Sequence, residues 1–228
     1  MGLATYAVNR VNLLAAIRHR FSRSPVPRRT PLRDVRFVVL DTELTSLDKR
    51  TNRLLSVGAI AMRGPRILLG EQFYRVVNPG VDIPATSIVV HGLRPEDIAL
   101  GDSPDAVLSD LHGFLGVSVL VGHFVGIDAH VLDKELRAIG GSLALHAIDT
   151  ARAFHWLMLQ KALADGHDHV SAPLDLASVA AHYSIAVHDA HHALVDAFVT
   201  AQVWQRILYD LEAAGVTTLG RALRIASR

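Results

Sequence analysis

Four acidic residues and one histidine stand inside apolar stretches of this sequence, where an unpaired carboxylate is expensive to bury. They are Asp41 and Glu43 in VVLDTELTSLD, Asp128 in VGHFVGIDAHVL, and His191 with Asp196 in HHALVDAF. Carboxylate oxygens are the ligands that hard divalent cations such as Mg²⁺ and Mn²⁺ prefer, and a histidine can carry a proton near neutral pH. If the five side chains converge, they have the chemistry to hydrolyse a phosphodiester with two metal ions and a base.

Each of these motifs has a simpler interpretation when it is taken alone. On a strand, residues i and i+2 point to the same side, so Asp41 and Glu43 share a face, but an acidic pair at a strand end can simply be solvated. Asp128 stands between a strand and a helix, where the helix dipole stabilises an acid. His191 lies in a histidine-rich stretch and could be a surface residue. Only the combination of the three motifs carries a functional argument.

The elements that must position these residues predict an α/β fold. The apolar, β-branched run 37–41 is typical of a central strand covered on both faces, and 53–64 and 67–79 extend it as an antiparallel meander. Strands and helices then alternate, which predicts a mixed sheet of roughly five strands flanked by helices. The later expected elements are 103–116 (helix), 117–123 (strand), 129–141 (helix), 144–154 (strand, then helix), 172–185 (helix) and 192–215 (helix).

Composition limits the class of protein. The chain has 228 residues, half of them apolar, which is long enough for one sizeable folded domain. It has no cysteine, which excludes disulfides, thiolate zinc sites and cysteine nucleophiles and fits a reducing compartment. No apolar run reaches the roughly 18 residues that a membrane span needs, and no secretory signal is visible. We therefore expect a cytoplasmic protein.

The positive charge is concentrated near the N-terminus. Eight of the 23 basic residues but only one of the 22 acidic residues lie within 1–36, so the remainder has a net charge of −6. Residues 6–21 are typical of a helix with Arg10, Arg18 and Arg20 on one flank. Such a segment could be a phosphate-contacting arm, a membrane-surface helix, an organellar presequence or a helix that docks on the domain.

We divide the chain into three parts. Residues 1–33 form the basic helix and a Pro/Arg linker, 34–213 form the domain with the five candidate residues, and 214–228 form a helical tail. The tail has no clamp-binding peptide, and its pattern indicates one more packed helix with a basic last turn.

In order and spacing, the three motifs resemble the DEDDh group of the DnaQ-like 3′–5′ exonucleases, to which proteins like the epsilon subunit of DNA polymerase III belong. The resemblance runs from about Arg36 to Ile207. It rests on DTE, on GHxxxxD about 80 residues later and on HxALxDA about 60 residues further on. The segments LTSLD, RLLSVGAI, VVNPG…IPATSIVVHGL and the pair Asp149-Thr150 are similar to the family at the expected places. The resemblance implies a ribonuclease H-like fold.

The resemblance also implies a role for each candidate residue. The four carboxylates would hold two divalent cations, Mg²⁺ or Mn²⁺. These ligands are Asp41, Glu43, Asp128 and Asp196. His191 would be the general base. His192 stands where the sister DEDDy group has a tyrosine, but the HxALxDA motif aligns on His191.

The implied substrate is a 3′ end of single-stranded nucleic acid, from which nucleoside 5′-monophosphates are released. Thr42, Leu44 and His91 would cradle the terminal nucleotide. DNA, as in proofreading or repair, is the expected substrate, and short RNA is its nearest rival because both share the phosphodiester. A DNA polymerase or a sliding clamp is the expected partner.

Four positions depart from the family pattern. Leu44 and Ser46 replace the common Thr and Gly after DTE. Phe124 replaces the Asn of the usual GHN, and Ile127 replaces the Phe before the aspartate. Leu44 and Phe124 could offer surfaces for unpaired bases, although we expect Phe124 and Ile127 to be core replacements. None of the four removes a ligand or the base, so substrate preference is affected more than activity.

Two other classes of function remain open on the sequence alone. One is a catalytically weak, polymerase-associated module that binds nucleic acid. The other is a zinc protein built on the histidines between His167 and His192, although these lack the spacing of a known zinc motif.

Overall fold

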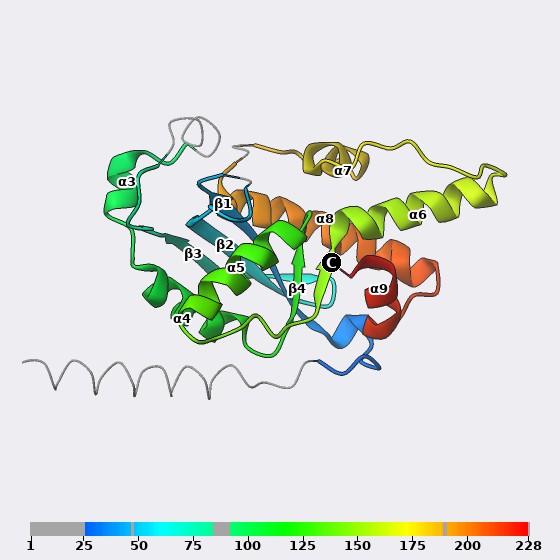
Figure 1. Cartoon of the computed structure of the whole chain (residues 1–228). Helices are drawn as coiled ribbons and strands as arrows, with labels where there is room; N and C mark the ends of the chain where they lie inside the picture. Colours follow the sequence, from blue (N-terminus) through cyan, green and yellow to red (C-terminus); the bar gives the residue numbers. More distant parts are fainter. Residues whose placement is uncertain (1–25, 47, 84–91, 189–190, 228) are drawn as a thin grey trace, which may run out of the picture.

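Five strands form one mixed sheet at the centre of the computed structural model (Figure 1). The strands are β1 (Arg36–Leu44), β2 (Leu54–Arg63), β3 (Arg66–Val76), β4 (Val119–Gly122) and β5 (Ala147–Asp149). Their order across the sheet is β3-β2-β1-β4-β5. The β1–β2 and β2–β3 pairs are antiparallel, whereas β4 pairs in parallel with β1 and β5. The predicted meander and the mixed five-stranded sheet are confirmed.

The structure describes residues 26–46, 48–83, 92–188 and 191–227. The helix that we predict at 6–21 and the candidate nucleotide-binding residue His91 lie outside these residues.

Helices cover both faces of the sheet (Figure 1). A short 3₁₀ turn, η1, precedes β1, and seven α-helices are labelled from α3 onward. Their bounds are η1 (Leu32–Asp34), α3 (Pro95–Ala99), α4 (Pro104–Leu115), α5 (Gly126–Ala138), α6 (Thr150–Ala164), α7 (Leu176–His182), α8 (Ala193–Ala213) and α9 (Leu219–Ala226). Side chains of α4 and α5 form one apolar core with the sheet, and those of α6 to α9 form a second core on the other face.

The middle strand β1 divides its side chains between these two cores. Phe37 and Val39 pack with the α6–α9 side, whereas Val38 and Leu40 pack with the α4–α5 side. The long helix α8 is fixed to β1 by Trp204, whose ring meets that of Phe37 edge to face at 5.4 Å. This alternation sets the direction in which the polar end of β1 points.

The first and last described segments pack against each other. The Leu32 N–H donates to the Thr217 carbonyl, and the Gly220 N–H donates to the Arg28 carbonyl at 2.7 Å. Leu32 and the α9 residue Leu219 are both buried. The part of the expected linker from Val26 onward is therefore part of the packed domain. Among the described residues, no helix is long and apolar enough to cross a membrane.

Candidate active site

The C-terminal end of β1 supplies two of the predicted carboxylates. Continuing the alternation of the strand, Asp41 and Glu43 face the α8 side, and Thr42 between them faces α5. The pairing of β1 with β2 shifts register between Glu43 and Leu44, so the strand ends in an irregularity directly after the acidic pair.

The first turn of α8 brings Asp196 to the same place. One carboxylate oxygen from each of Asp41, Glu43 and Asp196 lies within 4.8 Å of the other two, and no histidine joins this group or any other such group in the described chain. The histidine-rich zinc site is therefore not formed by described residues.

A glycine makes this approach of α8 possible. Gly58 is the β2 partner of Asp41, and a Cβ atom placed on it would lie 2.2 Å from the backbone nitrogen of Leu194. Any other residue at position 58 would push α8 away from the sheet. Sequence reasoning missed this residue, because an isolated glycine in a strand signals a close backbone contact without saying with what.

Asp128 lies in the first turn of α5 and is 6% exposed. Its Oδ1 accepts a hydrogen bond of 2.7 Å from the hydroxyl of Thr42. It is not a member of the three-carboxylate group, but it is close enough for its charge to raise the pKa of Asp41 and of Glu43. We expected Thr42 to lie near the substrate, and its hydroxyl is thus engaged with a candidate metal-binding carboxylate.

The four carboxyl groups hold their protons unusually tightly. Burial, and then the charges of its three neighbours, raise the pKa of Asp41 well above its ordinary range. Burial, Asp196 and Asp128 raise the pKa of Glu43 to about 8. Burial raises the pKa of Asp128 to about 7 and also raises that of Asp196. Such mutual repulsion is what a bound divalent cation would relieve, so this donor set fits a hard metal ion.

The two adjacent histidines have different surroundings. His192 is the N-cap residue of α8 without a side-chain capping bond, and its ring stacks on Tyr74 of β3 at 4.7 Å with an angle of 22° between the planes. His191 is exposed and has a left-handed backbone with φ of 68°, and its N–H donates to Asp196 Oδ2 at 2.8 Å. The ring of His192 is held against Tyr74, whereas His191 is exposed, so of these two rings that of His191 is the one free to reach a substrate.

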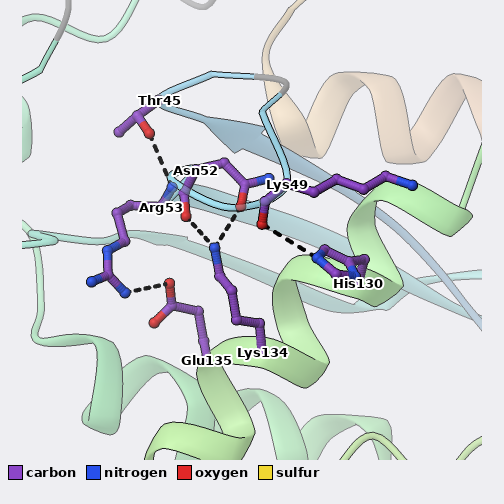
Figure 2. Close-up of polar contacts among 7 residues, drawn as sticks. All are labelled: Thr45, Lys49, Asn52, Arg53, His130, Lys134 and Glu135. Carbon is purple, nitrogen blue, oxygen red and sulfur yellow. Dashed lines mark hydrogen bonds and ion pairs between the residues drawn. The ribbon is translucent and has the colours of Figure 1, made fainter.

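The loop between β1 and β2 is held on α5, as Figure 2 shows. Lys134 donates to the backbone carbonyl of the fully buried Asn52 and, at 2.5 Å, to its side-chain oxygen. Arg53 pairs with Glu135 at 3.3 Å, and a ring nitrogen of His130 lies 3.4 Å from the Lys49 carbonyl. These contacts fix the chain that follows Glu43 and the half-buried Leu44.

Two of the departures from the family pattern are not core replacements. Phe124 is 46% exposed and Ile127 is 37% exposed. Phe124 follows β4 in a turn with φ of 55°, where its N–H donates to Asp149 Oδ1 at 3.2 Å. Our expectation for both residues is wrong, because this turn directs apolar side chains outward beside Asp128.

Comparisons with known proteins show what this chain is similar to. A family model described as an exonuclease, RNase_T, matches residues 38–204. A DNA polymerase III subunit epsilon-like protein of Rhodobacter capsulatus is 32% identical over 198 residues, which cover 85% of this chain and 27% of that protein. The DNA polymerase III subunit epsilon of Aquifex aeolicus is 26% identical over 183 residues, 80% of this chain and 85% of its own.

Solved structures give the same fold. Exonuclease I of E. coli in complex with a dT13 oligonucleotide superposes with a TM-score of 0.68 at 14% identity, over 80% of this chain and 43% of that chain. The chain is much shorter than several relatives: it spans 27% of the R. capsulatus protein and 13% of a PolC-type DNA polymerase III of Thermotoga maritima.

Proposed function

Because the chain belongs to the RNase_T exonuclease family, we propose that it is a metal-dependent 3′–5′ exonuclease that releases nucleoside 5′-monophosphates from single-stranded DNA. The observation that carries this proposal is the convergence of Asp41, Glu43 and Asp196 on one point. Buried carboxylates that repel one another are unfavourable for folding, and a cation-dependent reaction gives them a use.

The metal-binding residues in this proposal are four carboxylates. They are Asp41, Glu43, Asp128 and Asp196, which would hold two Mg²⁺ or Mn²⁺ ions. When bound, such ions acidify a water and neutralise charge on a phosphate. The Thr42 hydroxyl orients Asp128 through its hydrogen bond, and Gly58 admits the α8 backbone that carries Asp196.

His191 is the general base in this mechanism. Its exposed ring accepts a proton from the water that attacks the terminal phosphodiester. The bond between phosphorus and the 3′ oxygen of the preceding nucleotide breaks, and that oxygen takes up a proton from solvent water as the nucleoside 5′-monophosphate leaves. His191 then returns its proton to solvent. His192 holds the loop in place by stacking on Tyr74, which supports the choice of His191.

The terminal nucleotide lies next to the loop after β1. Thr42 borders this place with both its hydroxyl and its backbone N–H directed at Asp128, and Leu44 offers a half-buried apolar side chain. His91 is the third residue that we assign to this contact.

The choice of DNA over RNA rests on relatives that carry the names of DNA polymerase III subunits. By analogy with these relatives, we place the protein in the cytoplasm beside a DNA polymerase. Residues 34–213 carry the exonuclease site in this proposal, and the segment from Val26 and helix α9 pack against them.

The test uses 5′-labelled single-stranded DNA and RNA of the same sequence, incubated with Mg²⁺, Mn²⁺ or EDTA. The wild-type protein is compared with Asp41→Ala and with Asp105→Ala, which removes an exposed acid from α4. We expect a metal-dependent ladder that shortens from the 3′ end, is faster on DNA, persists in Asp105→Ala and is absent in Asp41→Ala.

Other outcomes lead elsewhere. Faster shortening of RNA would make the protein an exoribonuclease. No ladder on either substrate with folded protein would refute the catalytic proposal and favour a binding module.

A further inference from the structure

A groove of about 650 Å³ lies between the start of α5 and the outer side of α6, next to the carboxylate site. We call it the α5–α6 groove. Its lining includes Lys49, Phe124, Ile127, Arg152, His155 and Trp156. Two lining residues connect the groove to the carboxylate site. Ile127 directly precedes Asp128 in the chain, and Asp149 is close enough to Asp128 for its charge to help raise the pKa of Asp128. The groove therefore begins at the edge of the candidate active site.

Phe124 is held in the groove by a strained backbone. A left-handed conformation is unfavourable for a residue other than glycine and persists where the surroundings enforce it. Here the Phe124 N–H is fixed by Asp149, and the neighbouring His123 is fixed by Thr150 Oγ1 at 2.9 Å and by the Leu174 carbonyl at 2.6 Å. The result is an aromatic ring that stays 46% exposed.

Positive charges stand along the same groove. Lys49 and Arg152 are exposed, and Figure 2 shows the Lys49 side chain extending away from its backbone, whose carbonyl faces His130. Arg152 reaches the Ser227 carbonyl with one nitrogen at 2.6 Å and keeps its charge at the rim. Asp149 also lines the groove, but it is only 5% exposed. Its Oδ1 already accepts hydrogen bonds from the N–H groups of Phe124 and Ala151.

An exposed aromatic ring between basic side chains is the combination that binds single-stranded nucleic acid, because bases stack on the ring while phosphates meet the cations. We propose that the α5–α6 groove holds the unpaired nucleotides that precede the scissile bond, with a base on Phe124 and phosphates at Lys49 and Arg152. This inference rests on the proposed function, and it names a contact for the substrate strand beyond its terminal nucleotide.

Binding without catalysis tests the groove. The affinity for a fluorescent single-stranded oligonucleotide of about 12 nucleotides is measured in EDTA, over about 0.05 to 0.2 M salt. The variants are Phe124→Gly and Lys49→Ala, with Arg66→Ala as the control, because Arg66 is an exposed cation on β3 at the opposite edge of the sheet. Glycine adopts the backbone of position 124 without strain, so Phe124→Gly removes the ring without straining the fold.

The two variants should differ in their salt dependence. Phe124→Gly should weaken binding about tenfold at every salt concentration, since it removes stacking and no charge. Lys49→Ala should reduce the slope of log affinity against log salt by about 0.7, which is the loss of one phosphate contact to a single strand. Arg66→Ala should match the wild-type protein.

Hydrolysis supplies a second readout. The p-nitrophenyl ester of thymidine 5′-monophosphate reaches only the carboxylate site. The ratio of kcat/KM on the oligonucleotide to that on the ester should therefore fall about tenfold in Phe124→Gly. Wild-type affinity and an unchanged ratio in both groove variants would overturn the inference while leaving the exonuclease intact. A wild-type protein that binds through the groove but hydrolyses neither substrate would instead refute the proposed function alone.

Discussion

Replacing Glu43 by glutamine tests whether the metal-free site destabilises the fold through its charges. Burial and the neighbouring carboxylates of Asp196 and Asp128 raise the pKa of Glu43 from 4.5 to about 8. The folded protein therefore keeps this proton up to about pH 8, whereas the unfolded chain releases it near pH 4.5. The unfolded state binds fewer protons in that window, so the free energy of unfolding falls as pH rises through it. At about 1.4 kcal/mol per pKa unit, the loss amounts to roughly 3 to 5 kcal/mol above pH 8.

The assay is urea unfolding in EDTA at about pH 4 and about pH 9, on either side of this window. Glu43→Gln should equal the wild-type protein at the lower pH and exceed its free energy of unfolding by roughly 3 to 5 kcal/mol at the higher pH. Glu212→Gln, an exposed change on α8, should keep the wild-type pH dependence. A Glu43→Gln protein that is less stable at both pH values would refute the reasoning, since the carboxylate would then be a favourable structural contact.

Three further predictions concern the residues that surround the carboxylates. His191→Ala should lower kcat by about 10² to 10⁴-fold in the labelled-strand assay with folding intact. His192→Ala should instead lower the free energy of unfolding by about 1 kcal/mol, because it loses the stacking on Tyr74. Equal kinetic loss in both variants would contradict the choice of His191 as the base. Lys134→Met should lower the free energy of unfolding by roughly 1.5 to 3 kcal/mol in urea and expose the β1–β2 loop to proteolysis. An unchanged cleavage pattern would contradict the role of Lys134 in holding this loop on α5. Gly58→Ala should cost at least 1 to 3 kcal/mol, roughly the cost of overpacking, and weaken Mn²⁺ binding measured by calorimetry; unchanged Mn²⁺ affinity would contradict the role of the close helix contact.

Much of the fold follows from local patterns in the sequence. Residues 37–40 are apolar on both faces of the predicted strand, and β1 indeed contributes side chains to both cores. The expected helix after Ser103 is α4, in which the Ser103 side chain accepts from the Ala106 N–H. These features are readable because periodicity and capping depend on neighbours in the chain.

The candidate site was readable for a different reason. The three motifs lie far apart in sequence, and only their resemblance to a family gives their joint order a meaning. What the residues alone could not give is contact across the fold. Gly58 matters because Leu194 approaches it, and Lys134 matters because it reaches Asn52, 82 positions away. Phe124 was misjudged because an aromatic residue type predicts burial, whereas in the structure it stands in a left-handed turn and is 46% exposed.

The hydrogen bonds between the first and last described segments bring the two described ends of this fold close together. Arg28 meets the start of α9, and Ser227 at the end of α9 bridges to Ile148 of β5. These two points are thus one short helix apart, about 12 Å for eight residues. A fold closed in this way tolerates insertion into a host chain and circular permutation, because neither requires its core to open. A single unit of this kind can therefore be carried by polypeptides of very different length.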